Sequence, residues 1–466
     1  MKKTFLVASL LFALTACGGG SSAPEQTTSL TDQLSQSGSE SPGATETPTT
    51  VEKPLSCDEP FDENQMAFDF LKTNYLWPEA LPSTFNKEDY TSISQVMDAV
   101  KAPEDNFSVA FSQEQFEKVF VQQEELSTGI TFSINKIQNQ IRVASVRKGS
   151  PAYQAGIKRG MRFKLVNGIS EAGLLAYMAD KRPGQILIPD SFVRTSAEML
   201  SYNMELYELD GDIASFTNIP LQSISIEPVY DSRVVNVATA SGQKKVGYLA
   251  VSDFNQLLTE QMPAVFAELS THQVQELILD LRYNGGGYVS TSAQMASHIG
   301  GSKVENQIYQ QLVGNNHTRE YDKTFYFPTL NETLSIQRVI VLSSNATCSA
   351  SEGVINGLKP YMDVVLIGDK TCGKPYGMVP EPICDTVLFA LNFQGLNADG
   401  EGGFANGIMP NCYANPHDFA GDWTSSTDAL FQSAVDYIRD GTCNTVSSAS
   451  NDEPYLFHQP PVNLFD

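Results

Sequence analysis

The chain is poor in the residues on which many kinds of functional site depend. Among its 466 residues, 30 lysines and arginines face 54 acidic residues, which gives a formal net charge of −24. Because nucleic-acid binding needs a basic face, this balance argues against nucleic acid as a partner. The five histidines do not accompany a G-x-S-x-G nucleophile elbow. The composition therefore disfavours a serine–histidine–aspartate site.

Cysteines are few, and their spacing does not favour a metal site. The seven cysteines contain no C-x-x-C pair, and only His417 lies near a cysteine at a suggestive spacing. We therefore predict no metal and no other cofactor. The six cysteines that follow Cys17 form an even number, which is typical of disulfide bonds in a secreted chain. Their pairing stays open among fifteen possible sets; the six are Cys57, Cys348, Cys372, Cys384, Cys412 and Cys443.

Long apolar runs are scarce as well, and the one at the amino terminus is too short to favour a membrane-spanning helix. It reads MKKTFLVASLLFALTAC and combines two lysines, an apolar stretch and a final Leu-Thr-Ala-Cys. This pattern predicts a cleaved signal peptide over residues 1–16. Its end resembles a bacterial lipobox, which implies lipidation of Cys17. The alternative is an ordinary secretory signal with a chance cysteine.

Residues 17–55 are rich in serine, threonine, glycine, glutamate, glutamine and proline and have almost no large apolar side chains. Such a segment cannot bury enough surface to fold, so we expect a flexible tether. A lipidated cysteine on a tether places the protein in the bacterial cell envelope. Gly18, rather than aspartate, follows the cysteine, which favours the outer membrane, facing the periplasm or the exterior. The tail at 446–466 shows no periodicity.

The rest of the chain divides into three parts by its pattern. Residues 56–120 show helical spacing in FDENQMAFDFLKTNYLW and TSISQVMDAV. Residues 121–228 read as short alternating strands. Residues 229–445 alternate strands with helices, which indicates a parallel or mixed sheet covered by helices; late strands are expected at Thr386–Phe393 and Gly407–Met409. The overall prediction is a multidomain α/β protein.

The stretch from Val339 to Gly377 holds the residues with the most suggestive chemistry. VIVLSS and VVLIGD read as buried parallel strands, with a helix from Ser349 to Lys359 between them. Ser349 at the mouth of this helix and Lys374 beyond the second strand would reach the crevice at the strand ends. They could form a Ser–Lys nucleophile pair if burial lowers the lysine pKa. A helix-capping serine and a surface lysine are the structural alternatives.

A second strand, LILDLRYN, runs into three consecutive glycines, Gly285 to Gly287. Backbone N–H groups without side chains in the way suit an oxyanion hole, with the N–H of Ala350 as a second donor. A tight turn or close helix packing is the alternative use of the glycines. We expect Asp280 and Arg282 to fix the end of the strand through ion pairs or backbone hydrogen bonds.

The stretch GSPAYQAGIKRGMRFKLVNG resembles a bacterial PDZ domain, with Ala152, Ala155 and Ile157 on one face of a short helix. The resemblance implies a groove for a peptide carboxyl terminus. Its loop would be formed by Thr128, Gly129 and Ile130, whose N–H groups could hold the terminal carboxylate while the peptide adds to a sheet edge. An ordinary small β domain is the alternative.

LDLRYNGGG, CSASE and GDKTCGK together resemble the signature stretches of the carboxy-terminal processing (tail-specific) peptidases, serine proteases with a Ser–Lys dyad and a PDZ domain. The separation 374 − 349 = 25 matches the family spacing. The resemblance implies Ser349 as nucleophile, Lys374 as general base, and Gly286 and Ala350 as oxyanion donors. It also implies a crotonase/ClpP-like β-β-α core with an inserted PDZ-like domain and a small N-terminal helical domain, acting on the carboxy-terminal segments of polypeptides.

Two departures from the family pattern lie beside the dyad. Met378 stands where many members carry a glutamine that orients the lysine. Cys348 and Cys372 would be near one another if the dyad forms, so a disulfide could clamp the site. Met378 keeps open a catalytically weak or inactive protein that binds peptides or hydrophobic ligands. An acyl hydrolase of small esters or amides is a further alternative.

Overall fold

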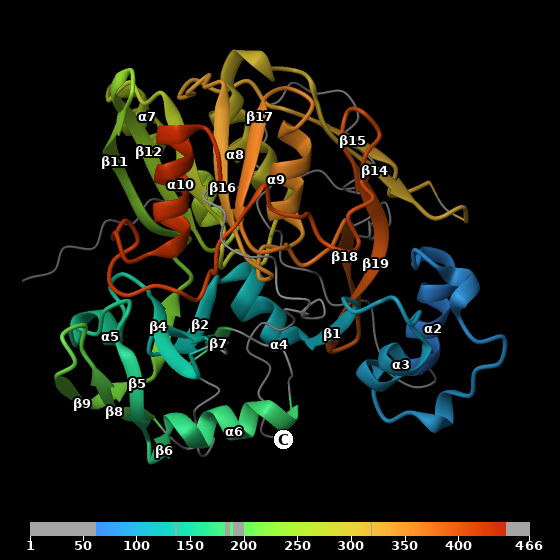
Figure 1. Cartoon of the computed structure of the whole chain (residues 1–466). Helices are drawn as coiled ribbons and strands as arrows, with labels where there is room; N and C mark the ends of the chain where they lie inside the picture. The colour runs from blue at the N-terminus through green and yellow to red at the C-terminus, as the bar shows by residue number, and fades with distance from the viewer. Residues whose placement is uncertain (1–61, 136–137, 182–186, 190–199, 318, 444–466) are drawn as a thin grey trace, which may run out of the picture. The chain divides into compact units, whose positions relative to one another are not determined.

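The computed structural model describes residues 62–135, 138–181, 187–189, 200–317 and 319–443 (Figure 1). The predicted signal peptide, tether and carboxy-terminal tail lie outside the described residues, as do Cys17 and Cys57. No helix in the described part is long and apolar enough to cross a membrane.

A six-stranded sheet forms the centre of the part of the chain from residue 229 onward, in the order β11-β12-β13-β16-β17-β20. All neighbours in it are parallel except the antiparallel pair β11–β12, so the sheet is mixed, as expected. Its strands are β11 (Val229–Thr239), β12 (Gly242–Val251), β13 (Glu276–Asp280), β16 (Arg338–Ser343), β17 (Asp363–Gly368) and β20 (Cys412–Tyr413). The strand expected at Gly407–Met409 is therefore wrong, because the chain pairs with β17 only from Cys412 on.

Helices cover both faces of this sheet, because side chains of one strand alternate between two apolar cores. Leu277 and Leu279 of β13 point into a core shared with three helices, while Ile278 points into the core beneath α10. The helices are α7 (Gln256–Thr271), α8 (Val289–Gly300) and α9 (Ala350–Leu358) on the first face and α10 (Ala429–Asp440) on the second, with a short 3-10 turn η5 (Gly301–Lys303) after α8. This alternation of strands and helices is the α/β fold predicted.

A second sheet is antiparallel and contains the segment that follows Lys374. β18 and β19 form a hairpin around Cys384, with Met378 opposite Leu391. The sheet consists of β1 (Val109–Ser112), β14 (Ile308–Gly314), β15 (Lys323–Tyr326), β18 (Tyr376–Ile383) and β19 (Thr386–Leu396). The strand expected at Thr386–Phe393 is therefore confirmed and is three residues longer.

The first described elements are helical and pack on β18 and β19. Asp62 and Ser92 cap α2 (Glu63–Asn74) and α3 (Ile93–Val100) by accepting hydrogen bonds from N–H groups of the first turn. Shorter helical turns follow: η1 (Pro78–Ala80), η2 (Lys87–Asp89), α4 (Gln113–Phe116) and the π-helical η3 (Glu117–Val121). The apolar residues of α2 and α3 share one core with Cys348, Cys372 and Leu391, so this region lies against the Ser349–Lys374 stretch.

The segment between η3 and β11 forms its own seven-stranded antiparallel sheet, in the order β7-β3-β4-β5-β8-β9 with β6 beside β5. Its elements are β3 (Ile130–Asn135), β4 (Gln140–Val146), α5 (Pro151–Gln154), β5 (Arg162–Val166), β6 (Ile169–Ser170), α6 (Glu171–Lys181), β7 (Leu187–Pro189), β8 (Ser201–Tyr207) and β9 (Ile213–Pro220). β2 (Glu124–Ser127) pairs with β10 (Gln222–Ser225). Ala152 and Ile157 are buried as predicted, but α5 ends at Gln154 and leaves Ala155 exposed.

Candidate active site

Ser349 lies at the start of α9, in a turn that side chains fasten to the neighbouring strand end. Thr347 Oγ1 donates a hydrogen bond to Leu281 O at 2.8 Å, and Ser351 Oγ donates to Asn284 O at 3.0 Å. The N–H of Cys348 also donates to Asn284 O at 3.1 Å. The turn before α9 and the turn after β13 are therefore held as one unit.

Ser349 has a backbone conformation that few residues with a side chain adopt. Its φ is 55° and its ψ is −116°. A positive φ costs a non-glycine residue conformational energy, and such strain is concentrated at functional sites. The side chain is half-buried at the mouth of α9, which separates it from an ordinary solvent-exposed capping serine.

The triple glycine brings its backbone against Ser349. A Cβ on Gly286, whose φ is +115°, would lie 2.9 Å from Ser349 Cβ and 3.2 Å from Ala350 N. A Cβ on Gly287 would lie 2.5 Å from Phe254 O. Only glycine permits these approaches, so the triple-glycine turn serves close packing. It also places the backbone of Gly286 beside Ser349, at the predicted position of an oxyanion donor.

The two predicted oxyanion donors differ in their present partners. As the first residue of α9, Ala350 has no carbonyl within the helix for its N–H. The N–H of Gly286 donates to Asn284 Oδ1 at 2.9 Å, and Asn284 is fully buried. The Gly286 donor is thus directed at a neighbouring side chain in this structure.

Buried charges fix the strand end that leads to the glycines. The Arg282 guanidinium donates to both oxygens of Asp280 at 2.6 to 3.0 Å and to Asp428 Oδ2 at 2.8 Å. Tyr248 OH donates to Asp280 at 2.7 Å. All four side chains are buried, so the predicted ion-pair role of Asp280 and Arg282 is confirmed.

Asp428 also receives an arginine from the seven-stranded sheet region. Arg159 Nη2 donates to Asp428 Oδ2 at 2.9 Å, and its guanidinium lies 4.0 Å from the ring centre of Phe419 and 4.4 Å from that of Trp423. Both arginines depress the pKa of Asp428, although burial opposes them. This carboxylate therefore connects the seven-stranded region with the strand that supplies Gly286.

Lys374 lies in the loop between β17 and β18, and only 8% of it is exposed. Its Nζ lies 3.9 Å from Met378 Sδ and 5.3 Å from the ring centre of Phe107. Burial lowers the pKa of Lys374 to about 8, while the charges of Asp105 and Glu352 act in the opposite direction. A substantial fraction of the amine is therefore neutral near pH 8, as a general base requires.

Glu352, one turn into α9, joins the serine and lysine segments. Its carboxylate accepts hydrogen bonds from the N–H groups of Ser349 at 3.0 Å, Gly373 at 2.9 Å and Lys374 at 2.8 Å, and from Thr371 Oγ1 at 2.5 Å. Burial raises the pKa of Glu352 to about 7, and these hydrogen bonds limit the rise. One side chain thus sets the distance between the backbones of the two candidate catalytic residues.

A disulfide fixes the same separation. Cys348 and Cys372 are bonded, with their Cα atoms 5.2 Å apart. A second disulfide joins Cys412 to Cys443 across 5.3 Å. Cys348, Cys372 and Glu352 also form a group that could hold a metal ion within the described residues. Both sulfurs are engaged in the disulfide, however, and a disulfide offers no thiolate to a metal.

The structure thus brings Ser349, Ala350, Gly286 and Lys374 into one site, whereas Thr128, Gly129 and Ile130 lie elsewhere. Thr128 and Gly129 form the turn between β2 and β3, Ile130 is the first residue of β3, and all three are buried. The N–H of Gly129 donates to Ser127 Oγ at 2.8 Å, and a Cβ on Gly129 would lie 2.3 Å from Ser150 Cβ. Cys17 lies outside the described residues.

Sequence reasoning missed three residues of this site: Glu352, Phe107 and Asp105. Glu352 follows Ser349 by three positions, which is the S-x-x-E spacing of a capping box and could have marked it. Phe107 and Asp105 carry no such mark, because they reach Lys374 from the segment between α3 and β1. Their role depends on packing between distant parts of the chain.

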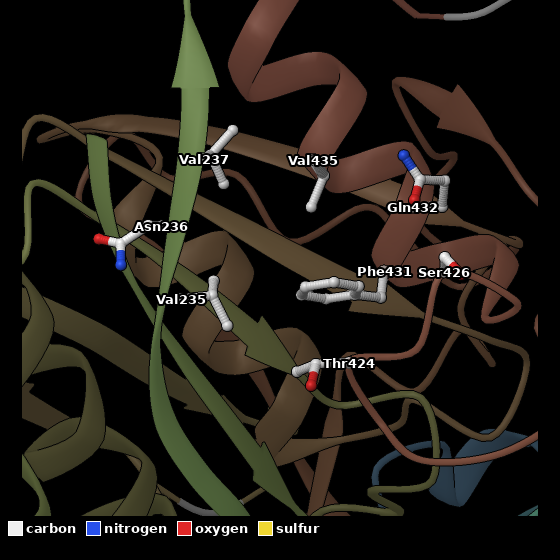
Figure 2. A pocket seen from close by; sticks show the side chains of 8 residues that line it. All are labelled: Val235, Asn236, Val237, Thr424, Ser426, Phe431, Gln432 and Val435. Atoms are coloured by element: carbon white, nitrogen blue, oxygen red, sulfur yellow. The ribbon is translucent and has the colours of Figure 1, made fainter. Parts of the chain in front are cut away.

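A hollow of about 250 Å³ lies away from this site, between β11 and α10 (Figure 2). Its walls are largely apolar, with Val235 and Val237 on one side and Phe431 and Val435 on the other. It is lined by no acid, base or thiol, so we assign it no chemistry.

Known proteins are similar to this chain in sequence and in fold. Residues 245–414 match the model of peptidase family S41. A carboxyl-terminal-processing protease of Synechocystis is 24% identical over 407 residues, which cover 86% of this chain and 88% of that protein. The carboxy-terminal processing protease CtpA of Bacillus subtilis is 24% identical over 375 residues, which cover 78% and 71%.

A solved structure supports the same assignment of the fold. A Bacteroides fragilis protein assigned to the S41 proteases superposes with a TM-score of 0.63 at 23% identity, covering 83% of this chain and 99% of that one. The matched region, residues 245–414, contains Gly286, Ser349 and Lys374. Residues 245–414 of this chain therefore match peptidase family S41, and the chain is similar to carboxyl-terminal processing proteases over most of its length.

Proposed function

We propose that the protein is a serine endopeptidase that cleaves polypeptides with a Ser349–Lys374 dyad. The observation that carries the proposal is a buried lysine whose pKa is lowered to about 8, on a loop that one carboxylate fastens to the N–H of the strained serine. The match to peptidase family S41 supports peptide-bond hydrolysis, and the position of the two residues in the matched region supports their roles.

In the proposed reaction Ser349 Oγ attacks the peptide carbonyl carbon while its proton passes to the neutral Lys374 Nζ. The resulting ammonium then gives that proton to the leaving amine, the C–N bond breaks, and an acyl-enzyme remains on Ser349. Water repeats the cycle with Lys374 as base, which releases the acid and restores the serine. Burial of the lysine is essential because a fully charged ammonium could not accept the first proton.

The tetrahedral oxygen would be held by the N–H groups of Ala350 and Gly286. The Ala350 N–H is supported by its place at the amino end of α9, where the helix dipole favours negative charge. Gly286 can contribute only when Asn284 Oδ1 releases its N–H. We therefore expect Ala350 to be the donor present in the resting enzyme.

In this proposal residues 121–228 form a PDZ-like domain that recognises the carboxyl terminus of the substrate. Residues 229–445 form a crotonase/ClpP-like core, and residues 56–120 form a small helical domain. A peptide adding to β3 would bind on the edge opposite β4. That edge pairs with β7 in this structure, with Phe132 opposite Ile188. Peptide binding at the Thr128–Ile130 loop would therefore require β7 to move aside.

We propose that lipidation of Cys17 anchors the enzyme in the bacterial envelope, with the outer membrane as the favoured site. The support is the lipobox-like sequence and the polar tether that follows it. Metabolic labelling with a palmitate analogue should mark the wild type and leave Cys17→Ser unmarked. Equal labelling of both would contradict the anchor while leaving the peptidase proposal intact.

The peptidase proposal is tested with the full chain in detergent, incubated with an unfolded protein. Ser349→Ala and Lys374→Ala should each reduce digestion to background, whereas Ser426→Ala, a serine beside the hollow in Figure 2, should digest like the wild type. Digestion by Ser349→Ala at the wild-type rate would overturn the proposal. Mass spectrometry of wild type treated with a fluorophosphonate should place a phosphonyl group on Ser349, with fluoride as the leaving group.

A second candidate is a catalytically weak protein that binds peptides, and two observations favour it. The N–H of Gly286 is occupied by Asn284, and Met378 offers Lys374 only a thioether. This candidate predicts peptide binding without digestion in the wild type. An acyl hydrolase of small esters would hydrolyse p-nitrophenyl acetate without cleaving the unfolded protein.

A further inference from the structure

The segment between α3 and β1 brings an aromatic ring and a carboxylate to Lys374. Phe107 places its ring face 5.3 Å from the Lys374 Nζ, and Asp105 acts on the charge of the same amine. Both side chains are buried, with exposures of 4% and 2%. They belong to a different part of the sequence from the residues that match the peptidase family model.

Hydrogen bonds fix this segment in one conformation. Asp105 Oδ1 accepts from the N–H groups of Phe107 and Ser108, both at 2.8 Å. Asp105 Oδ2 accepts from Tyr75 OH at 2.8 Å, and the same hydroxyl accepts from Ala102 N at 3.0 Å. The Phe107 ring is therefore placed by a closed set of hydrogen bonds as well as by apolar packing.

Hydrogen bonds also fix the position of this segment relative to the β18–β19 hairpin, which carries Met378. The N–H of Leu391 donates to Ser108 Oγ at 3.0 Å, and Leu391 O accepts from Leu76 N at 2.7 Å. Leu391 lies opposite Met378 in the β18–β19 ladder. Phe107 and Met378 thus approach the lysine from two segments that are both hydrogen-bonded to strand β19.

The neighbours of the lysine amine are a thioether and an aromatic ring. In the described part of the chain its Nζ shows two contacts, the thioether of Met378 at 3.9 Å and the face of Phe107, and neither is an oxygen. A thioether is a weak hydrogen-bond acceptor, so Met378 gives the amine little direction. An aromatic face attracts an ammonium more strongly than a neutral amine.

We infer that Phe107 and Asp105 are positioning residues for the catalytic lysine: the ring directs the Lys374 amine, and the carboxylate stabilises its ammonium form during the reaction. The inference rests on the proposed Ser–Lys function. Lys374 becomes an ammonium when it takes the Ser349 proton and is neutral again when the leaving amine receives it. Groups that favour the ammonium therefore assist the first transfer and must not be strong enough to retain the proton.

Phe107→Leu tests the ring, because leucine keeps an apolar side chain and removes the aromatic face. We expect kcat to fall about 3- to 10-fold with little change in KM. Phe107→Tyr keeps the ring and should retain most of the wild-type kcat. Phe68→Leu is the matched control, since Phe68 is equally buried in the same apolar core but stacks on Phe85. It should lower thermal stability without the loss of kcat.

Asp105→Asn tests the charge, because asparagine can still accept hydrogen bonds through Oδ1. The charges that act on the lysine are those of Asp105 and of Glu352 from α9. Tyr376 of β18 and Tyr75 at the end of α2 are the titratable groups that interact with Asp105 and with its neighbour Glu104. Loss of the Asp105 charge should make the ammonium easier to deprotonate. The acidic limb of the kcat/KM profile should then move to lower pH by about 0.5 to 1 pH unit.

The rate at which a fluorophosphonate labels Ser349, followed against pH, gives the same information for variants too weak to assay on a protein. If Phe107→Leu behaves like Phe68→Leu and the Asp105→Asn profile coincides with the wild type, the positioning roles are wrong. The peptidase proposal would survive that result as long as Ser349→Ala is inactive. Activity in Ser349→Ala would instead overturn the function on which the inference rests.

Discussion

Ser349 is held where two neighbouring strand ends meet, whereas Lys374 is held by contacts from several segments beyond the sheet. The turn before α9 holds Ser349 at a positive φ, with Thr347 and Ser351 bonded to the adjacent strand end. Lys374 depends on Glu352, on the Cys348–Cys372 disulfide and on Phe107. The position of Ser349, the proposed nucleophile, thus depends on the ends of β13 and β16, and that of Lys374, the proposed base, depends on tertiary packing around its loop.

This difference predicts how each half of the dyad fails. Changes beside Ser349 should act on transition-state stabilisation with little effect on the pH profile. Changes around Lys374 should alter the pH profile or the geometry of proton transfer. The following variants separate the two kinds of failure.

The largest effect is expected from Gly286→Ala. Its Cβ would lie 2.9 Å from Ser349 Cβ, on a residue whose φ of +115° already disfavours a side chain. The serine turn or the glycine turn must shift, and loss of one oxyanion donor alone lowers kcat about 100-fold or more. Gly285→Ala is the control, since a Cβ there meets nothing within 4 Å. Equal rates for both variants would contradict the packing argument.

Glu352→Gln should act on both halves at once. The amide keeps one acceptor oxygen, so it can serve either Thr371 and Gly373 or Ser349 and Lys374, but not both pairs. Its NH2 would then face N–H groups of the other pair. We expect kcat to fall about 10- to 100-fold and the free energy of unfolding to fall by about 2 to 3 kcal/mol. Chemical denaturation gives the second quantity. Wild-type stability in this variant would show that the carboxylate is dispensable.

Removal of the Cys348–Cys372 disulfide should slow catalysis through the lysine side. The bond closes a loop with a sequence separation of 24, and the Cys412–Cys443 bond closes one of 31, so each should contribute about 3 kcal/mol to unfolding stability. Cys348→Ser/Cys372→Ser should lose this stability and several-fold in kcat. Cys412→Ser/Cys443→Ser, compared at a temperature where both stay folded, should lose stability alone. A matching loss of kcat in both pairs would mean that the first disulfide has no special relation to the site.

The wild-type pH dependence is the mildest test. With a Lys374 pKa of about 8, kcat/KM should rise with pH through that value as the amine becomes neutral. The pKa in the folded protein lies below the ordinary value of 10.5, so the folded state binds fewer protons than the unfolded state between pH 8 and 10.5. This group therefore makes unfolding stability rise with pH across that window. A kcat/KM profile that is flat from pH 7 to 9 would argue against a titrating lysine.

Much of the part from residue 229 onward could be predicted because its signals are local. β16, α9 and β17 match the strands and helix expected around Ser349, and the β13 strand ends at the Asp280–Arg282 pair as expected. Apolar runs of the right length and a serine at a helix start depend only on nearby residues. The nearness of Ser349 to Lys374 followed from strand order, since neighbouring parallel strands end at one edge.

What could not be predicted depends on contacts between distant segments. The Cys412–Cys443 bond, the pairing of β7 with β3, and the approach of Phe107 to Lys374 leave no pattern in their own neighbourhoods. The Cys348–Cys372 bond, by contrast, agrees with the expectation that the Ser349 and Lys374 segments lie together. The strand expected at Gly407–Met409 failed for a related reason. That stretch has suitable residues, but the chain reaches an unoccupied edge of the sheet only at Cys412.

Asp428 limits how freely parts of this chain could be exchanged with those of relatives. Its carboxylate accepts from Arg159 of the seven-stranded region and from Arg282 beside the glycine turn. A chimera that imported a foreign 121–228 segment without an arginine at that place would leave Asp428 with one cation instead of two, and the rings of Phe419 and Trp423 without the guanidinium that lies over them. Recombination at the boundaries suggested by sequence would then weaken the support of the oxyanion turn, although no residue near Ser349 had changed.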